Sequence, residues 1–203
     1  MAKFLRPGDE RDIFVAKWEL EFIDTFHMKE LYRTAHDFLS ENGWSDPEGG
    51  ETWEYFYYER IIYPKGEKEH RAWWRVQLLP NNSKYVRYFI KLDYRTLHMT
   101  PAEVIVNGKK YKTWRGSVVM YCDAWLQLDY QNRWSNHWLM RHFDKFFRKR
   151  IYKPYWEAHK LELYKKCYDF NKEMKRFLRL KTPVKEPRPF RHVTGIPPPE
   201  EAL

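Results

Sequence analysis

The stretch SVVMYCDAWLQLDY, residues 117–130, decides the fold of this 203-residue chain. Its apolar side chains occupy alternate positions: Val118, Met120, Cys122, Ala124, Leu126 and Leu128. An apolar period of two over this length indicates a β-strand with one buried face. Cys122 falls on that apolar face, where a cysteine is typically an inert buried thiol.

Strand patterns continue upstream, in a block that begins at Trp53. Residues 53–63 are rich in aromatic and β-branched side chains, and residues 72–78 and 85–96 alternate between apolar and polar side chains. The polar turns PKGEKE and LPNNSK separate these runs, and LHMTPA breaks the pattern again. Asn107-Gly108 then lies between two extended runs, which is a strong hairpin signal because both residues tolerate a positive φ. The block predicts antiparallel strands with one buried and one solvated face.

A strand and a helix precede this block. Residues 13–24 alternate with a period of two, which predicts a first strand. Apolar residues then recur every three or four positions, which predicts a helix over residues 27–41 with Gly43 at its C-cap. The apolar positions of this helix are Met28, Leu31, Ala35 and Phe38.

Residues 139–181 hold the net charge of the whole chain. They contain fourteen Lys and Arg residues and five acids, a surplus that equals the formal net charge of +9. Charge concentrated in one segment favours an anionic partner. Pro154 suits the first turn of a helix, and the apolar stripe after it predicts a long amphipathic helix. The stripe consists of Trp156, Leu163, Cys167, Phe170, Met174 and Phe177.

These elements predict one α+β domain over residues 1–181. It has an antiparallel sheet of about six strands packed on a long C-terminal helix, with one short helix after the first strand. Residues 182–203 hold six of the twelve prolines, and we expect this tail to be disordered or to lie along a partner.

In element order the chain resembles the helix-grip class, which includes START-like, Bet v 1-like and polyketide-cyclase-like proteins. The resemblance covers about residues 13–181 and implies a cavity for a hydrophobic ligand between the sheet and the last helix. The many Trp and Tyr residues on the strands are expected to fill most of that cavity. The segments HMKELYRTAHDFL and FFRKRIYK also resemble those of small uncharacterised archaeal proteins, which implies no activity.

Catalytic motifs are missing from the sequence. None of GxGxxG, GxxxxGK[ST], HExxH or GxSxG occurs, and the eight histidines are scattered. We expect His36 and His159 to be surface or capping residues. Asp123 and Asp129 lie about 20 Å apart along one strand face, at ~3.3 Å per residue, which is too far for a pair of hydrolase carboxylates. We expect these acids and Asp93 to pair with Arg and Lys on neighbouring strands, and predict no enzyme, metal or cofactor.

The densest cluster of positive charge surrounds Pro154. Its cations are interleaved with tyrosines and barely balanced by acids one helical turn away, an arrangement that suits phosphate contact and stacking on unpaired bases. We predict a non-enzymatic module that docks on an anionic polymer or ribonucleoprotein, with RNA preferred to DNA. The predicted nucleic-acid-binding residues are Arg141, Lys145, Arg148, Lys149, Arg150, Tyr152, Lys153 and Tyr155.

Other interpretations stay open. The cations of the last helix can simply be its solvated face. The cluster also suits anionic lipid headgroups, although a helix that lies on a membrane does not need a large sheet above it. A helix-grip pocket for an apolar small molecule is the main alternative, and a subunit of a larger assembly, with the Pro-rich tail as a contact for a protein partner, is a further one.

Composition predicts the compartment. The two cysteines form no CxxC spacing, which suggests neither a disulfide framework nor a Cys-rich zinc site. No window approaches the ~20 apolar residues of a spanning helix, and the N-terminus has no secretory pattern. We therefore expect a cytoplasmic protein without a transmembrane segment.

Overall fold

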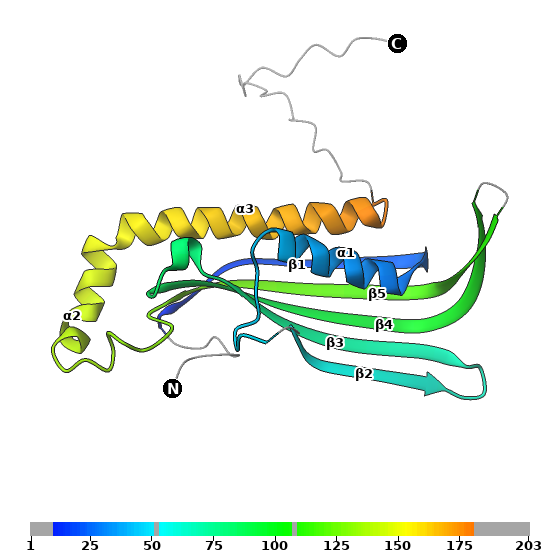
Figure 1. Cartoon of the computed structure of the whole chain (residues 1–203), viewed down its shortest axis with the longest axis horizontal. Helices are drawn as coiled ribbons and strands as arrows, with labels where there is room; N and C mark the ends of the chain where they lie inside the picture. Colours follow the sequence, from blue (N-terminus) through cyan, green and yellow to red (C-terminus); the bar gives the residue numbers. More distant parts are fainter. Residues whose placement is uncertain (1–9, 51–52, 107–108, 181–203) are drawn as a thin grey trace, which may run out of the picture.

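The computed structural model describes residues 10–50, 53–106 and 109–180. A five-stranded antiparallel sheet carries α1 and α3 on one face (Figure 1). This confirms the predicted α+β class and its order of strand, helix, antiparallel strands and long C-terminal helix. The elements are β1 (Asp12–Phe26), α1 (Met28–Glu41), β2 (Glu54–Ile62), β3 (Glu67–Leu78), η1 (Pro80–Asn82), β4 (Val86–Val106), β5 (Lys109–Leu128), α2 (Met140–Phe146), η2 (Phe147–Ile151) and α3 (Lys153–Phe177). The predicted Pro-rich tail lies outside the described residues.

The first and last strands of the sheet are neighbours. The strand order is β1-β5-β4-β3-β2, and every adjacent pair is antiparallel. The stretch 117–130 therefore occupies β5 and the turn after it, between β1 and β4. Cys122 pairs with Trp18 on one side and with Leu92 on the other, so the predicted apolar faces coincide.

The sheet has five strands because LHMTPA does not end a strand. β4 runs through this segment with a register shift between Leu97 and Thr100, where His98 takes a φ of 52°. Pro101 is tolerated because β3 makes its last pair at Met99, so only β5 flanks the proline. The predicted turn at Asn107-Gly108 lies outside the described residues, although the strands on either side of it pair antiparallel up to their ends.

The core lies between the sheet and the two helices. The middle of the predicted stripe on α3 is fully buried, from Leu163 to Met174. Trp18 on β1 donates its indole N–H to the carbonyl of Cys167 at 3.1 Å, and its ring lies 5.6 Å from that of Phe170. α1 begins and ends as predicted, and His27 caps it by accepting a hydrogen bond from the backbone N–H of Glu30.

The opposite face of the sheet mixes aromatic and charged side chains. Phe56 on β2 lies 4.4 Å, ring to ring, from Trp73 on β3, and both are 38% exposed. Asp93 accepts a hydrogen bond from Arg75 at 2.7 Å, which confirms its predicted pairing with a neighbouring strand. Asp123 differs from that prediction, because its buried Oδ1 accepts no hydrogen bond.

Candidate functional site

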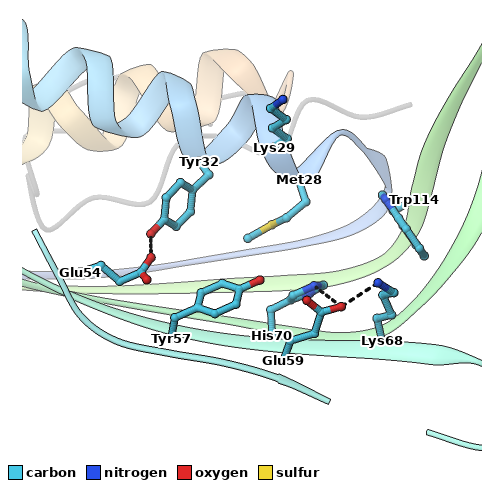
Figure 2. Close-up of a pocket in the computed structure, with 9 residues that line it drawn as sticks. All are labelled: Met28, Lys29, Tyr32, Glu54, Tyr57, Glu59, Lys68, His70 and Trp114. Carbon is cyan, nitrogen blue, oxygen red and sulfur yellow. Dashed lines mark hydrogen bonds and ion pairs between the residues drawn. The ribbon is translucent and has the colours of Figure 1, made fainter. Parts of the chain in front are cut away.

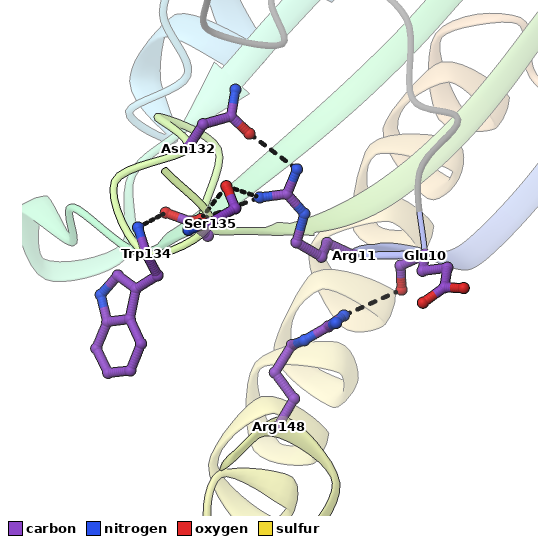
Figure 3. A network of polar contacts seen from close by, with 7 residues as sticks. Glu10, Arg11, Asn132, Trp134, Ser135 and Arg148 are labelled. Carbon is purple, nitrogen blue, oxygen red and sulfur yellow. Dashed lines mark hydrogen bonds and ion pairs between the residues drawn. The ribbon is translucent and has the colours of Figure 1, made fainter. Parts of the chain in front are cut away.

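One buried carboxylate connects residues 131–155, here called the basic end, to the sheet. Asp129 follows β5 and accepts hydrogen bonds from the backbone N–H groups of Trp134 and Ser135. Arg11, just before β1, donates to Asp129 at 3.0 Å, to Ser135 Oγ at 2.7 Å and to Asn132 at 2.8 Å (Figure 3). This network fixes the turn from which the basic end starts.

The basic end extends away from the sheet. α2 lies beyond the end of the strands, and α3 then runs back over the sheet (Figure 1). Arg148 contacts the start of β1 by donating to the backbone carbonyl of Glu10 at 3.3 Å (Figure 3). Pro154 lies in the first turn of α3, as the sequence predicted.

Three of the predicted nucleic-acid-binding cations are exposed in the described structure. Arg141 and Arg150 have no acidic partner within the described residues, whereas Lys153 lies 4.0 Å from Glu157. The side chains of Lys145 and Lys149 lie outside the described part of the chain, as does that of Asp144.

The other predicted residues have structural contacts. The ring of Tyr152 packs against Tyr85, Phe147 and Tyr155, with centroids 5.0–5.6 Å apart, so neighbouring rings cover part of it. Tyr155 is 47% exposed and covers His159. Arg148 is half-buried. The structure thus assigns part of the predicted cluster to packing.

The basic end carries large apolar side chains that are exposed, and sequence reasoning missed their exposure. We call this group the apolar tip, and its members are between 40% and 74% exposed: Trp138, Leu139, Met140, Phe143, Phe146 and Ile151. Their apolar character was visible in the sequence. Their exposure was not, because it depends on α2 lying beyond the sheet that would have covered them.

The cations of α3 are better balanced than the sequence suggested. Four of them lie within 4.0 Å of an acid three or four residues away: Lys153 with Glu157, Lys166 with Glu162, Lys172 with Asp169, and Arg176 with Glu173. Such exposed pairs are typical of the solvated face of a helix. Much of α3 therefore fits the structural interpretation, whereas Arg141 and Arg150, in α2 and η2, have no such acid within the described residues.

A groove of about 510 Å³ opens between α1 and the β2–β3 edge of the sheet (Figure 2). Its volume is within the range of about 300–1,000 Å³ typical of small-molecule sites. The lining residues are Met28, Lys29, Tyr32, Glu54, Tyr57, Glu59, Lys68, His70 and Trp114. They come from α1, β2, β3 and β5, so no local sequence motif indicated this groove.

Two carboxylates in the groove have different partners. Glu59 accepts a hydrogen bond from Lys68 at 2.7 Å and lies 3.8 Å from His70. Glu54 accepts from the hydroxyl of Tyr32, which in turn accepts from the indole N–H of Trp74 at 2.7 Å.

These contacts shift several pKa values. The hydrogen bond from Lys68 lowers the pKa of Glu59, and burial lowers the pKa of His70. Burial raises the pKa of Tyr32 and of Tyr57, and nearby carboxylates raise both further. Both phenols are therefore neutral at physiological pH, and they can donate hydrogen bonds to the carboxylates.

His159 is buried, and its prediction as a surface or capping residue was wrong. Its Nδ1 lies 2.6 Å from the hydroxyl of Tyr88, which also donates to Glu162 at 2.9 Å. The helical periodicity placed His159 next to the apolar stripe but did not show that Tyr88 on β4 faces it. His36 does lie at the surface of α1, where its ring stacks on Trp53.

Within the described ranges, no three His, Cys, Asp or Glu side chains converge as metal ligands. No helix in the described part of the chain is long and apolar enough to cross a membrane. No protein-family model matches the sequence, and no curated protein matches it significantly. Any function must therefore be argued from the basic end and the groove themselves.

Proposed function

We propose that this chain is a non-enzymatic binding module that docks on an anionic lipid surface through its apolar tip. The observation that carries the proposal is the exposure of six large apolar side chains at one end of the molecule. Arg141 and Arg150 lie among them in sequence and have no acidic partner in the described structure.

The composition of the tip favours lipid. A cluster of exposed apolar residues marks an interaction site. Leu139, Met140 and Ile151 have no aromatic ring, so they cannot stack on bases. Insertion into the headgroup–acyl boundary removes their apolar surface from water, which is favourable. Trp138 is of the type enriched at membrane interfaces. Each cation near an anionic membrane surface adds about 1 kcal/mol of attraction.

The position of the tip answers the objection that a large sheet is unnecessary above a membrane-lying helix. α2 lies beyond the end of the strands (Figure 1), so the tip can contact a surface while the sheet stays in water. The sheet then acts as a soluble scaffold, and α2 as its attachment.

RNA, predicted from the sequence, is the second candidate. The exposed rings of Trp138, Phe143 and Phe146 beside arginines are suitable for stacking on unpaired bases and contacting phosphates. This candidate leaves the three exposed aliphatic side chains unexplained, which is why we place it second.

The small-molecule alternative finds its support elsewhere in the fold. The element order supports the resemblance to the helix-grip class, whose cavity would lie between the sheet and α3. The contact of Cys122 with Cys167, and that of Trp18 with Phe170, occupy that space along the middle of α3. A ligand site is better supported in the groove beside α1.

Co-sedimentation with vesicles tests the proposal. We expect the full chain to bind vesicles of phosphatidylcholine with phosphatidylglycerol, and to bind pure phosphatidylcholine vesicles weakly. Both Phe143→Ser/Phe146→Ser and Arg141→Glu/Arg150→Glu should lower the bound fraction several-fold.

Matched variants elsewhere on the surface are the controls. Tyr55→Ser/Tyr63→Ser removes exposed rings at and after β2, and Lys110→Glu/Lys165→Glu reverses two exposed cations; neither should change vesicle binding much. If the chain instead binds single-stranded RNA with a steep salt dependence and ignores both kinds of vesicle, the second candidate replaces the first. If it binds neither, both are wrong.

A further inference from the structure

The groove beside α1 already holds an ammonium group of the chain itself. The Nζ of Lys68 lies 2.7 Å from Glu59 and 5.5 Å from the ring centre of Trp114. One carboxylate and one aromatic ring therefore bracket this cation, the arrangement that proteins use to bind organic ammonium groups.

The other half of the groove repeats this chemistry. Glu54 lies beside the rings of Tyr32 and Tyr57, and no Lys or Arg within the described residues pairs with its carboxylate (Figure 2). Tyr57 lies between this half and the half that contains Lys68 (Figure 2). The chain thus provides a second carboxylate and two rings at one place without a cation of its own.

Tyr32 connects this half of the groove to the core. The hydroxyl of Tyr32 donates to Glu54 and accepts from Trp74, and its ring lies 4.5 Å from that of Trp74. Trp74 is 1% exposed and belongs to the core. A carboxylate held by such a tyrosine loses little conformational entropy when a ligand binds.

We propose that this groove binds a small organic ammonium compound, a primary or methylated amine on an apolar body. The ammonium group contacts Glu54 and the rings of Tyr32 and Tyr57, and the apolar body extends along Met28 toward Trp114. This function is separate from docking through the apolar tip.

Other ligand charges fit less well. A neutral apolar ligand would desolvate the carboxylate of Glu54 without compensation. An anionic ligand would face the carboxylate of Glu54, which no Lys or Arg of the described residues pairs with, whereas Lys68 is already paired with Glu59. Lys29 does not reverse this preference, because its amine points away from the two carboxylates (Figure 2).

Matched probes of different charge test the proposal by calorimetry and by amide chemical shifts. The probes are phenethylamine, its trimethylammonium analogue, phenethyl alcohol and phenylpropionate. We expect the two cations to bind at least tenfold more tightly than the alcohol and the anion. Shifts should concentrate at residues 28–32, 54–59, 68–70 and 114.

Substitutions separate the groove from general attraction of cations. Glu54→Gln and Tyr57→Leu should each weaken binding of both ammonium probes about tenfold, whereas Glu103→Gln, an exposed acid on β4, should leave it unchanged. Equal binding of the neutral probe, an unchanged affinity in Glu54→Gln, or no groove shifts at millimolar probe would each overturn the proposal. Vesicle binding of Glu54→Gln should equal that of the wild type, so this test does not depend on the lipid proposal.

Discussion

The sulfur atoms of Cys122 and Cys167 lie 3.8 Å apart in the core, where β5 faces α3. Both cysteines are free and fully buried. Burial, and then the contact with Cys167, raise the pKa of the Cys122 thiol. The sequence correctly predicted a buried Cys122, but a separation of 45 residues gave no sign that the two thiols would meet.

Neither thiol should react with Ellman's reagent in the native protein. Both thiols are buried out of reach of the reagent, and the raised pKa of Cys122 further limits its thiolate, so labelling must wait for unfolding. The measurement compares native protein with protein in denaturant, where two thiols should react. Ser40→Cys, which adds an exposed thiol on α1, is the positive control and should be labelled at once. Rapid labelling of the native wild type would contradict the packing of α3 on β5.

Asp129→Asn should lower the free energy of unfolding by about 3 kcal/mol, because it leaves Arg11 without its buried counter-charge. Asparagine tolerates the φ of 48° at this position, so backbone strain does not confuse the result. Urea unfolding gives the magnitude. Hydrogen exchange should also quicken at residues 131–139, since Asp129 fixes this turn.

Asp169→Asn is the matched control for that prediction. It removes an acid that pairs with Lys172 at 3.0 Å on the exposed face of α3, and should cost less than about 1 kcal/mol. Similar losses in the two variants would show that Asp129 does not hold the basic end.

Side-chain periodicity predicted the fold because each strand has one buried face. The alternation in 13–24 and 117–130 placed Trp18 and Cys122 on that face, and the structure pairs them. The sequence predicted about six strands because a proline normally ends a strand that is paired on both sides. At Pro101 only β5 pairs with β4, so the strand continues through the proline. That depends on where β3 ends, which the residues of β4 do not encode.

The candidate sites depended on information that periodicity lacks. The exposure of Phe143 and Phe146 follows from the position of α2 beyond the sheet. The groove needs Tyr32 and Glu54, separated by a helix end and a loop, to meet within hydrogen-bond reach. Such contacts depend on the register and curvature of the sheet, and neither can be predicted from a single sequence.

Gly116→Ala should destabilise the protein by about 1–3 kcal/mol through overpacking. A Cβ at Gly116 would lie 2.7 Å from the sulfur of Met99 and 2.8 Å from the carbonyl oxygen of Leu97. The sulfur can move, but the carbonyl belongs to the irregular part of β4. Thermal unfolding measures the loss, with Ser117→Ala at the next position as the control. An unchanged melting temperature in Gly116→Ala would mean that β4 adjusts there at no cost.

The pair formed by Tyr88 and His159 predicts a loss of stability in acid. The hydroxyl of Tyr88 donates to Glu162, so Nδ1 of His159, 2.6 Å away, must carry the proton and donate to the tyrosine oxygen. Burial lowers the pKa of His159, although Glu162 opposes this. The ring of Tyr155 also faces the imidazole, and Glu162 is the one acid of the described residues within 4.0 Å of it.

The direction of this pH dependence follows from comparing the pKa of His159 in the folded and unfolded states. In the unfolded chain a histidine has a pKa of about 6.5, and in the folded protein that of His159 is lower. Between these two values the unfolded state binds more protons, so the free energy of unfolding falls as the pH falls below about 6.5 and levels off below the folded pKa. His70, whose pKa is also lowered by burial, contributes with the same sign.

Urea unfolding at a series of pH values, with titration of the imidazole resonances, measures this effect. In His159→Gln the free energy of unfolding should decline less steeply below about pH 6.5. The decline that remains should come partly from His70. His142→Gln, which removes an exposed imidazole from α2, should keep the wild-type slope. An imidazole of His159 that titrates above that of a free histidine would mean that Glu162 outweighs burial. His159 would then add stability as the pH falls through the same range, and the decline would become steeper, not shallower, in His159→Gln.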